Sequence, residues 1–242
     1  MASPAEPGLA GRTAVVTGAS GGIGRAVARR LAAGGARLAL VARARGPLAE
    51  VAAETGGLAV ACDVSDPAAV AALAERLRVA WGGLAPDILV NAAGTFGLAP
   101  IARTDPEQFD RHLAVNLRGP FLLIRAFLPG MLERKSGHVV SVGSIAGRRA
   151  FPDNGAYSAS KFGLRGLHSV LELELKGTGV RCTLVEPAAT DTPLWAGIDR
   201  SVHEGLPGPG QMLGADAVAD AVLFAVTRSP RTGIRTISLE RA

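Results

Sequence analysis

A tyrosine and a lysine four residues apart are the first candidates for chemistry in this chain. Tyr157 is the only tyrosine among the 242 residues, and Lys161 is one of three lysines. Residues i and i+4 share one face of a helix, so the two side chains are expected to be neighbours. An ammonium group beside a phenol favours the phenolate and lowers a pKa that starts near about 10. The pair predicts a general acid or base that works near neutral pH, although an ordinary helix-surface pair would have the same spacing.

A glycine-rich segment near the start of the chain predicts a binding site for phosphate groups. It runs Thr17-Gly18-Ala19-Ser20-Gly21-Gly22-Ile23-Gly24, after an apolar run and before a helical pattern. Glycines allow a tight turn and let backbone amides approach a pyrophosphate, while the helix N-terminus carries partial positive charge. A turn without a ligand is the alternative, but the position between a first strand and a first helix favours a dinucleotide site.

The end of the second predicted strand indicates which dinucleotide is bound. NAD-binding units usually have an acid there that binds the ribose 2′-hydroxyl. Here the strand leads into Ala42 and Arg43, with Arg45 close by, and the acid is missing. A guanidinium matches a 2′-phosphate in geometry and charge, so Arg43 favours NADP(H). NAD(H) stays open as the alternative, because a solvated surface arginine would fit the same sequence.

Composition argues for a globular α/β domain and against several other classes. Hydrophobic residues make up 48% and charged residues 19%, enough apolar material for a large core. A net charge of +5 and a pI near 10.0 raise nucleic-acid binding as an alternative, but the arginines are scattered and aromatics are only 4%. No apolar run reaches the about 18 residues of a membrane span, and the histidines and cysteines form no metal-binding pattern. We therefore expect a cytoplasmic protein with no metal, no nucleic-acid partner and no membrane segment.

Short apolar runs that alternate with helical patterns predict the fold. Such strands are buried on both faces, so they indicate a parallel sheet between two layers of helices, a three-layer, Rossmann-like, doubly wound α/β fold with about seven strands. The predicted strands are Thr13–Thr17, Arg37–Val41, Leu58–Asp63, Ile88–Asn91, His138–Ser141, Arg181–Val185 and Thr236–Leu239. Helices are predicted after the capping pairs Asp66-Pro67 and Asp105-Pro106, over Tyr157–Leu175 and over Asp216–Val226.

The chain is expected to form one domain with a tail and a long loop. Residues 1–11 predict a flexible tail, residues 12–242 a single dinucleotide-binding catalytic domain, and the irregular stretch 193–214 a substrate-binding lid. Phe96, Phe151 and Trp195 are the predicted substrate contacts beside Ser144 and Tyr157. Further apolar residues of the lid would complete the wall: Leu194, Leu206, Met212 and Leu213. Arg148, Arg149 and His203 either meet an acidic substrate group or face solvent.

Residues 12–240 resemble a short-chain dehydrogenase/reductase. The glycine turn matches the TGxxxGxG motif of that family, and Tyr157 to Lys161 matches YxxxK. Ser144, thirteen residues before Tyr157, matches the catalytic serine, and Asn116 matches the asparagine of the catalytic tetrad. The resemblance therefore implies a tetrad of Asn116, Ser144, Tyr157 and Lys161.

The resemblance also implies the cofactor contacts. Asp63-Val64 is similar to the pair that contacts adenine, Asn91-Ala92-Ala93-Gly94 to the motif that lines the cofactor, and Pro187-Ala188 to a Pro-Gly near the nicotinamide. The predicted contacts are Gly18, Ser20, Gly21, Gly22, Ile23, Gly24, Arg43, Asp63, Val64, Asn91, Ala92, Gly94, Tyr157, Lys161, Pro187, Thr190 and Thr192. Many NADP-dependent relatives have a basic residue where this chain has Gly21, so the NADP(H) prediction depends mainly on Arg43.

The implied activity is hydride transfer between NADP(H) and a carbonyl or alcohol, as in a ketoreductase. Tyr157 would exchange the proton, Lys161 would lower the Tyr157 pKa and bind the nicotinamide ribose, Ser144 would polarise the carbonyl, and Asn116 would hold a water. The expected substrate is an apolar, cyclic or acyl-chain ketone. An NAD-dependent alcohol dehydrogenase working oxidatively and a non-catalytic dinucleotide sensor are the alternatives. The resemblance further implies a homotetramer or homodimer, with the helix after Tyr157 packed on its copy.

Overall fold

Parallel strands form the centre of the molecule. The fold comes from a computed structural model, which describes residues 8–203 and 205–242. In this part of the chain one sheet has seven strands in the order β3-β2-β1-β4-β5-β6-β9. The strands are β1 (Thr13–Thr17), β2 (Arg37–Ala42), β3 (Leu58–Ala61), β4 (Ile88–Asn91), β5 (Gly137–Val142), β6 (Val180–Pro187) and β9 (Thr236–Leu239). From β1 the chain first builds the sheet outwards through β2 and β3, and then continues on the other side of β1 with β4. Folds with such a reversal bind ligands in the crevice beyond the carboxyl ends of the strands at that point.

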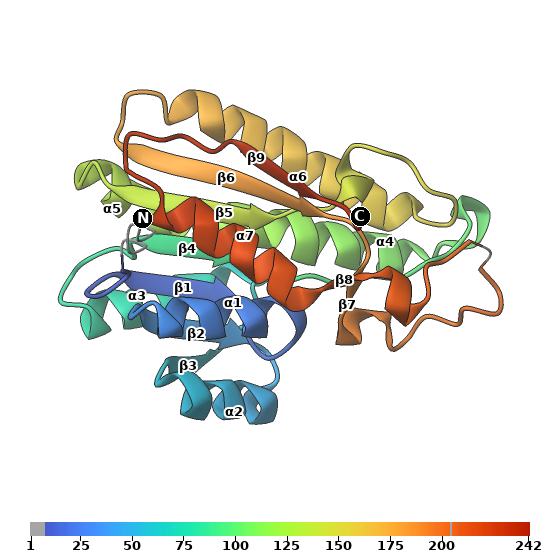
Figure 1. Cartoon of the computed structure of the whole chain (residues 1–242), viewed down its shortest axis with the longest axis horizontal. Coiled ribbons are helices and arrows are strands. Elements are labelled where there is room, and N and C mark those ends of the chain that lie inside the picture. Colours follow the sequence, from blue (N-terminus) through green and yellow to red (C-terminus); the bar gives the residue numbers. More distant parts are fainter. Residues whose placement is uncertain (1–7, 204) are drawn as a thin grey trace, which may run out of the picture.

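Helices cover both faces of the sheet (Figure 1). One face carries α1 (Gly22–Ala33), α2 (Arg45–Thr55) and α7 (Ala215–Thr227), and the other carries α3 (Pro67–Ala80), α5 (Gly119–Glu133) and α6 (Gly155–Glu174). A shorter helix, α4 (Pro106–Leu113), packs against α6. The predicted three-layer, doubly wound fold is confirmed.

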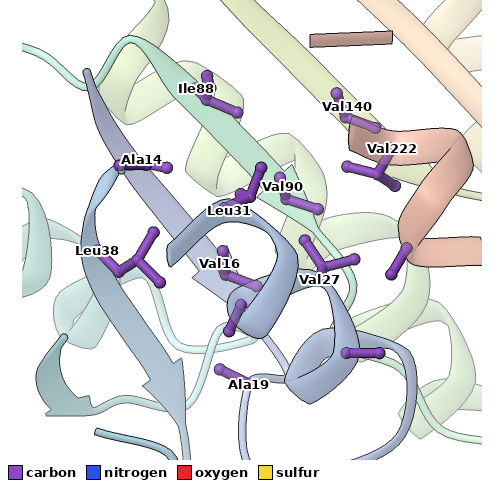
Figure 2. Close-up of a cluster of buried hydrophobic side chains, with 14 of the residues drawn as sticks. Ala14, Val16, Ala19, Val27, Leu31, Leu38, Ile88, Val90, Val140 and Val222 are labelled. Atoms are coloured by element: carbon purple, nitrogen blue, oxygen red, sulfur yellow. The ribbon is translucent and has the colours of Figure 1, made fainter. Parts of the chain in front are cut away.

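The core is divided between the two faces because side chains alternate along each strand. In β1, Val16 belongs to the core under α1 and α7, whereas Val15 belongs to the core under α3 and α5. Figure 2 shows the first of these cores, with Val27 and Leu31 of α1 over β1 and Val222 of α7 beside Val140 of β5. This packing fixes the ends of β1 and β4 relative to the start of α1.

Most predicted element boundaries are close to the observed ones. The two predicted N-caps are confirmed, since Asp66 accepts from the Ala68 amide and Asp105 from the Glu107 amide, each at 2.9 Å. β3 ends at Ala61, two residues earlier than predicted, because Asp63 turns to accept from the amide and hydroxyl of Ser65.

The first residues are less tail-like than predicted. Residues 1–7 of the expected tail lie outside the described residues. Leu9 is buried in the core, and its amide donates to the Gly34 carbonyl at 2.7 Å, so this described part of the predicted tail packs on the domain. No helix in the described part of the chain combines the length and apolarity that a membrane crossing needs.

The segment predicted as an irregular lid is held at both ends. Two short strands, β7 (Thr190–Asp191) and β8 (Leu213–Gly214), pair in parallel, and the Leu213 amide donates to the Ala189 carbonyl at 2.8 Å. Two single 3₁₀ turns, η4 (Pro193–Trp195) and η5 (Pro209–Gln211), lie between them. The segment therefore starts and finishes beside the carboxyl end of β6.

Candidate active site

A cavity of about 1030 Å³ lies beyond the carboxyl ends of the central strands. Its wall comes from the loops after β1 to β6 and from the lid. Most of the predicted site residues line it: Gly18, Ser20, Gly21, Gly22, Ile23, Arg43, Asp63, Val64, Ala92, Gly94, Phe96, Ser144, Phe151, Tyr157, Lys161, Pro187, Thr190, Thr192 and Trp195. Gly24, Asn91 and Asn116 are buried and do not line the cavity.

The glycine turn is packed too tightly for side chains at two positions. Gly18 has φ +69°, and a Cβ on it would lie 2.7 Å from the Ala92 carbonyl oxygen. A Cβ on Gly24 would overlap the Gly18 carbonyl. Thr17 ties the turn to the next strand end, because its hydroxyl accepts from the amides of Ala92 and Ala93, both at 3.1 Å. The turn and the segment after β4 therefore form one rigid wall.

The start of α1 fits a pyrophosphate. Its N-cap, Gly21, offers no side-chain acceptor, so the first-turn amides of the helix are not capped by a side chain. Space is open around Gly21, and Gly21, Gly22 and Ile23 all line the cavity. Uncapped amides at a helix N-terminus attract an anion, and a dinucleotide pyrophosphate satisfies this requirement.

Asp63 and Arg43, predicted to contact the adenosine part of the cofactor, both line the cavity. Asp63 accepts from the Ser65 hydroxyl at 2.7 Å and from the Ser65 amide at 2.9 Å. These bonds, and the charge of Arg43, hold the pKa of the Asp63 carboxyl below its usual value. The ionised carboxylate of Asp63 and the guanidinium of Arg43 therefore lie together here.

Tyr157 and Ser144 meet at the other end of the cavity. Tyr157 is in the first turn of α6, and its hydroxyl is near enough to the Ser144 side chain for Ser144 to influence its pKa. Ser144 also caps the 3₁₀ turn η3 (Ile145–Gly147) by accepting from the Ala146 amide at 3.1 Å. The cap fixes the position of the Ser144 hydroxyl in the cavity wall.

Burial shifts the pKa values of Tyr157 and Lys161 in opposite directions. Lys161 donates to the Val142 carbonyl at 2.9 Å, and its ammonium lies 5.6 Å from the centre of the Tyr157 ring. Burial raises the pKa of Tyr157 to about 12, although the hydrogen bond from Ser144 opposes the rise. Burial also lowers the pKa of Lys161 to about 8. The predicted lowering of the Tyr157 pKa by Lys161 is therefore wrong. The free energy lost when the phenolate is removed from water exceeds the stabilisation that neighbouring groups give it.

Asn116 lies behind the cavity wall in a π-helical turn, η2 (Ala114–Arg118), between α4 and α5. Its side-chain oxygen accepts from the Thr95 amide at 2.8 Å, and its nitrogen donates to the Thr95 carbonyl at 2.9 Å and to the Ser160 hydroxyl at 3.0 Å. The side chain joins the loop after β4 to the residue before Lys161. Both N–H groups of the Asn116 side chain are used, so a water held by Asn116, as predicted, would bind its side-chain oxygen or its backbone.

The predicted aromatic contacts come together over Tyr157. Phe96 packs edge-on against Tyr157, with ring centres 4.9 Å apart, and its centre is 4.8 Å from that of Trp195. The Trp195 indole donates to the Thr190 carbonyl at 3.0 Å, which holds the lid against β7. Phe151 lines the same region, as do Leu194 and Leu206, whereas Met212 and Leu213 do not.

The three basic residues near the substrate end have different environments. Arg148 is paired with Glu240 at 2.8 Å, and the His203 ring lies 2.8 Å from the Asp153 carboxylate. Neither lines the cavity. Arg149 does line it, with its guanidinium 5.2 Å from the centre of the Phe151 ring.

Sequence reasoning missed several lining residues, including Thr95, Asn154 and Arg241. Asn154 is 7% exposed, and its side-chain oxygen has no hydrogen-bond partner among the described residues. Arg241 follows β9 and is far in sequence from every motif. Neither has a local signal, because only the folded sheet brings them to the cavity.

Known proteins are similar to this chain in sequence and fold. A family model described as short chain dehydrogenase matches residues 12–202. A glycine betaine reductase of Emericella nidulans is 39% identical over 98% of this chain, which spans only 19% of that relative. A D-threitol dehydrogenase of Mycolicibacterium smegmatis is 38% identical over 89% of this chain and 86% of its own length. The crystal structure of a metagenomic short-chain oxidoreductase in complex with NADP, 37% identical, has a TM-score of 0.81 and covers 97% of this chain and 98% of its own.

Proposed function

Because the chain belongs to the short-chain dehydrogenase/reductase family, we propose that it is a ketoreductase that transfers hydride between NADP(H) and a carbonyl or alcohol. One observation carries the proposal: the Tyr157 phenol and the neighbouring Ser144 line the same cavity as the uncapped start of α1, which fits a dinucleotide pyrophosphate. Tyr157 is the general acid or base. The NADP bound by the related structure and the alcohol substrate in the name of the threitol relative support this reaction class.

The proposed cofactor contacts follow the cavity from one end to the other. Arg43 binds the 2′-phosphate, Asp63 and Val64 the adenine side, and the amides at the start of α1 the pyrophosphate. Lys161 binds the nicotinamide ribose, and Thr190 and Thr192 lie at the nicotinamide end. The bound cofactor supplies or accepts the hydride.

The protein's own contribution is hydrogen bonding and proton transfer at the substrate oxygen. The hydroxyls of Ser144 and Tyr157 donate to a carbonyl oxygen placed between them, and these bonds strengthen as the oxygen gains negative charge. With a pKa near 12 Tyr157 is protonated at neutral pH, and it transfers its proton to the alkoxide. The Lys161 ammonium lies 5.6 Å from the centre of the ring on which the phenolate forms. Asn116 positions Lys161 through Ser160.

Tyr157→Phe tests the proposal. The variant lacks the acid but keeps the ring packed against Phe96, so it should bind NADPH as the wild type does and lose carbonyl reduction by a factor of about 10³ or more. The measurement is NADPH oxidation with a panel of ketones, together with a titration of NADPH fluorescence. Full activity of the variant would exclude Tyr157 as the acid, and a wild type that binds the cofactor without turnover would favour the non-catalytic sensor.

The same panel, run with alcohols and NAD⁺ as well, separates the ketoreductase from the NAD-dependent alcohol dehydrogenase. The aromatic wall around Phe96, Trp195 and Phe151 favours ketones with an apolar portion beside the carbonyl. Faster turnover of alcohols with NAD⁺ than of ketones with NADPH would select the dehydrogenase.

A homotetramer or homodimer is part of the proposal. The outer face of α6 exposes Phe162, Val170 and Leu173, which are 47%, 53% and 60% accessible, and α5 exposes Phe121, which is 45% accessible. Large apolar side chains gathered on one pair of helices are typical of a subunit interface. Pairing of α6 with its copy would remove them from water.

A further inference from the structure

The substrate half of the cavity carries positive charge without matching negative charge. Arg149 and Arg241 both line the cavity that contains Ser144 and Tyr157. Asp63 is the only carboxylate among the described lining residues, and it lies beside Arg43 at the adenosine end. The cavity wall therefore includes two arginines, Arg149 and Arg241, in addition to Arg43.

The sheet brings Arg241 to this position. β9 pairs in parallel with β6, with Leu239 opposite Pro187, and the Ala188 amide donates to the Leu239 carbonyl at 2.8 Å. The chain after β9 consequently leaves the sheet at its carboxyl edge, beside the lining residues Ala188 and Ala189 (Figure 1).

An ion pair holds the two arginines on the same rim. Arg148 donates to the Glu240 carboxylate and to the Ser238 hydroxyl, each at 2.8 Å. Arg148 and Glu240 are the sequence neighbours of Arg149 and Arg241, so their bond joins the loop that carries Ser144 to the chain after β9. The Arg149 guanidinium lies over the face of the Phe151 ring, which attracts the cation.

Neighbouring basic groups are neutralised, and these two are not. Arg148 is paired with Glu240, Arg165 with the buried Glu186 at 2.6 Å, and His203 is hydrogen-bonded to Asp153. In the described residues neither Arg149 nor Arg241 has a carboxylate within ion-pair distance. Two unpaired guanidinium groups at one rim attract an oxyanion, which accepts their hydrogen bonds in a fork geometry.

We propose that Arg149 and Arg241 bind an oxyanion, a carboxylate or a phosphate, at the far end of a substrate whose carbonyl lies at Ser144 and Tyr157. The inference rests on the proposed function and narrows its substrate from an apolar ketone to an anionic one. The aromatic wall contacts the chain between the carbonyl and the oxyanion. Arg148 is a positioning residue that holds the rim together through Glu240.

Matched pairs of ketones test the inference. Levulinate, 5-oxohexanoate and 6-oxoheptanoate are compared with their methyl esters, and dihydroxyacetone phosphate with dihydroxyacetone, so that the two arms separate a carboxylate site from a phosphate site. Binding is measured by calorimetry on the protein with bound cofactor, and reduction by NADPH oxidation. At least one anionic ketone should bind about tenfold more tightly than its neutral partner, because each bond to a guanidinium is charge-assisted.

Arg149→Gln and Arg241→Gln should each lower the preference for the anionic over the neutral ketone by about tenfold, and in the kinetic assay the change should appear mainly in KM. Added salt should lower the same preference in the wild type. Arg76→Gln removes an exposed arginine of α3 far from the cavity and is the matched control. The inference is overturned if no pair favours the anion, or if the ratio in both variants equals that of the control. Failure of every ketone to accept hydride would instead overturn the proposed function, while the calorimetric ratio still decides the oxyanion site.

Discussion

Replacement of Arg43 by leucine isolates the charge that is proposed to select NADP(H). Arg43 directly follows β2, lines the cavity and is exposed to solvent. Leucine keeps part of the apolar stem and removes the guanidinium. A hydrogen bond to a charged group contributes about 1.5–3 kcal/mol, and solvent screening places this one near the lower end. Since about 1.4 kcal/mol is a factor of ten, the dissociation constant of NADPH should rise about ten- to thirtyfold.

The design has two internal controls. NADH lacks the 2′-phosphate, so its dissociation constant should change by less than about twofold. Arg45→Leu removes a second exposed arginine, two residues further on in the first turn of α2, which does not line the cavity. Titration of NADPH and NADH fluorescence at low and high salt supplies the measurement, and the wild-type preference for NADPH should narrow at high salt. Equal losses for both nucleotides in Arg43→Leu, or the same NADPH loss in Arg45→Leu, would refute the reasoning.

Three other predictions concern the turn, the buried histidines and the assembly. Gly24→Ala should abolish NADPH binding and lower Tm, because its Cβ overlaps the Gly18 carbonyl, whereas Gly46→Ala, with open space around it in α2, should bind normally; fluorescence titration and melting curves check both. Burial lowers the pKa of His168 to about 4, against 6.5 for an exposed histidine, so the unfolded chain binds more protons between these values. The free energy of unfolding should therefore fall as pH drops from about 6.5 to 4, and urea titrations should find a shallower fall for His168→Gln. Phe162→Glu on the exposed face of α6 should convert the oligomer to monomers in light scattering; a wild type that is already monomeric contradicts the proposed interface.

The sheet could be predicted because each of its strands carries its own signal. Runs such as those at β1 and β4 are apolar on both faces, and the capping pairs at Asp66 and Asp105 mark helix starts within a few residues. The β7–β8 pair could not be predicted, because two-residue strands separated by more than twenty residues have no periodicity. Leu9 was assigned to the tail for a similar reason, since one apolar residue among Pro, Ala and Gly is no pattern.

The candidate site divides in the same way. Residues carried by a motif, such as Ser144 and Tyr157, lie together at the cavity, whereas Arg241 reaches it only through the pairing of β9 with β6. The π-helical turn at Asn116 also has no sequence signal, because it depends on how α4 continues into α5. Spacing identifies which groups are present, and the register of the sheet decides which of them meet.

The pKa values of Tyr157 and Lys161 show a further limit of spacing arguments. The four-residue spacing correctly predicts neighbours, but it contains no information on burial, which raises the pKa of the phenol to about 12 and lowers that of the ammonium to about 8. Burial makes the phenolate form of Tyr157 unfavourable. Tyr157 therefore keeps its proton until hydride transfer has made the substrate oxygen the stronger base. Reduction therefore has its acid ready throughout the neutral range. Oxidation needs the phenolate first, and its rate should increase with pH well above neutrality. The same burial predicts that Tyr157 is protonated at neutral pH and can act there as an acid.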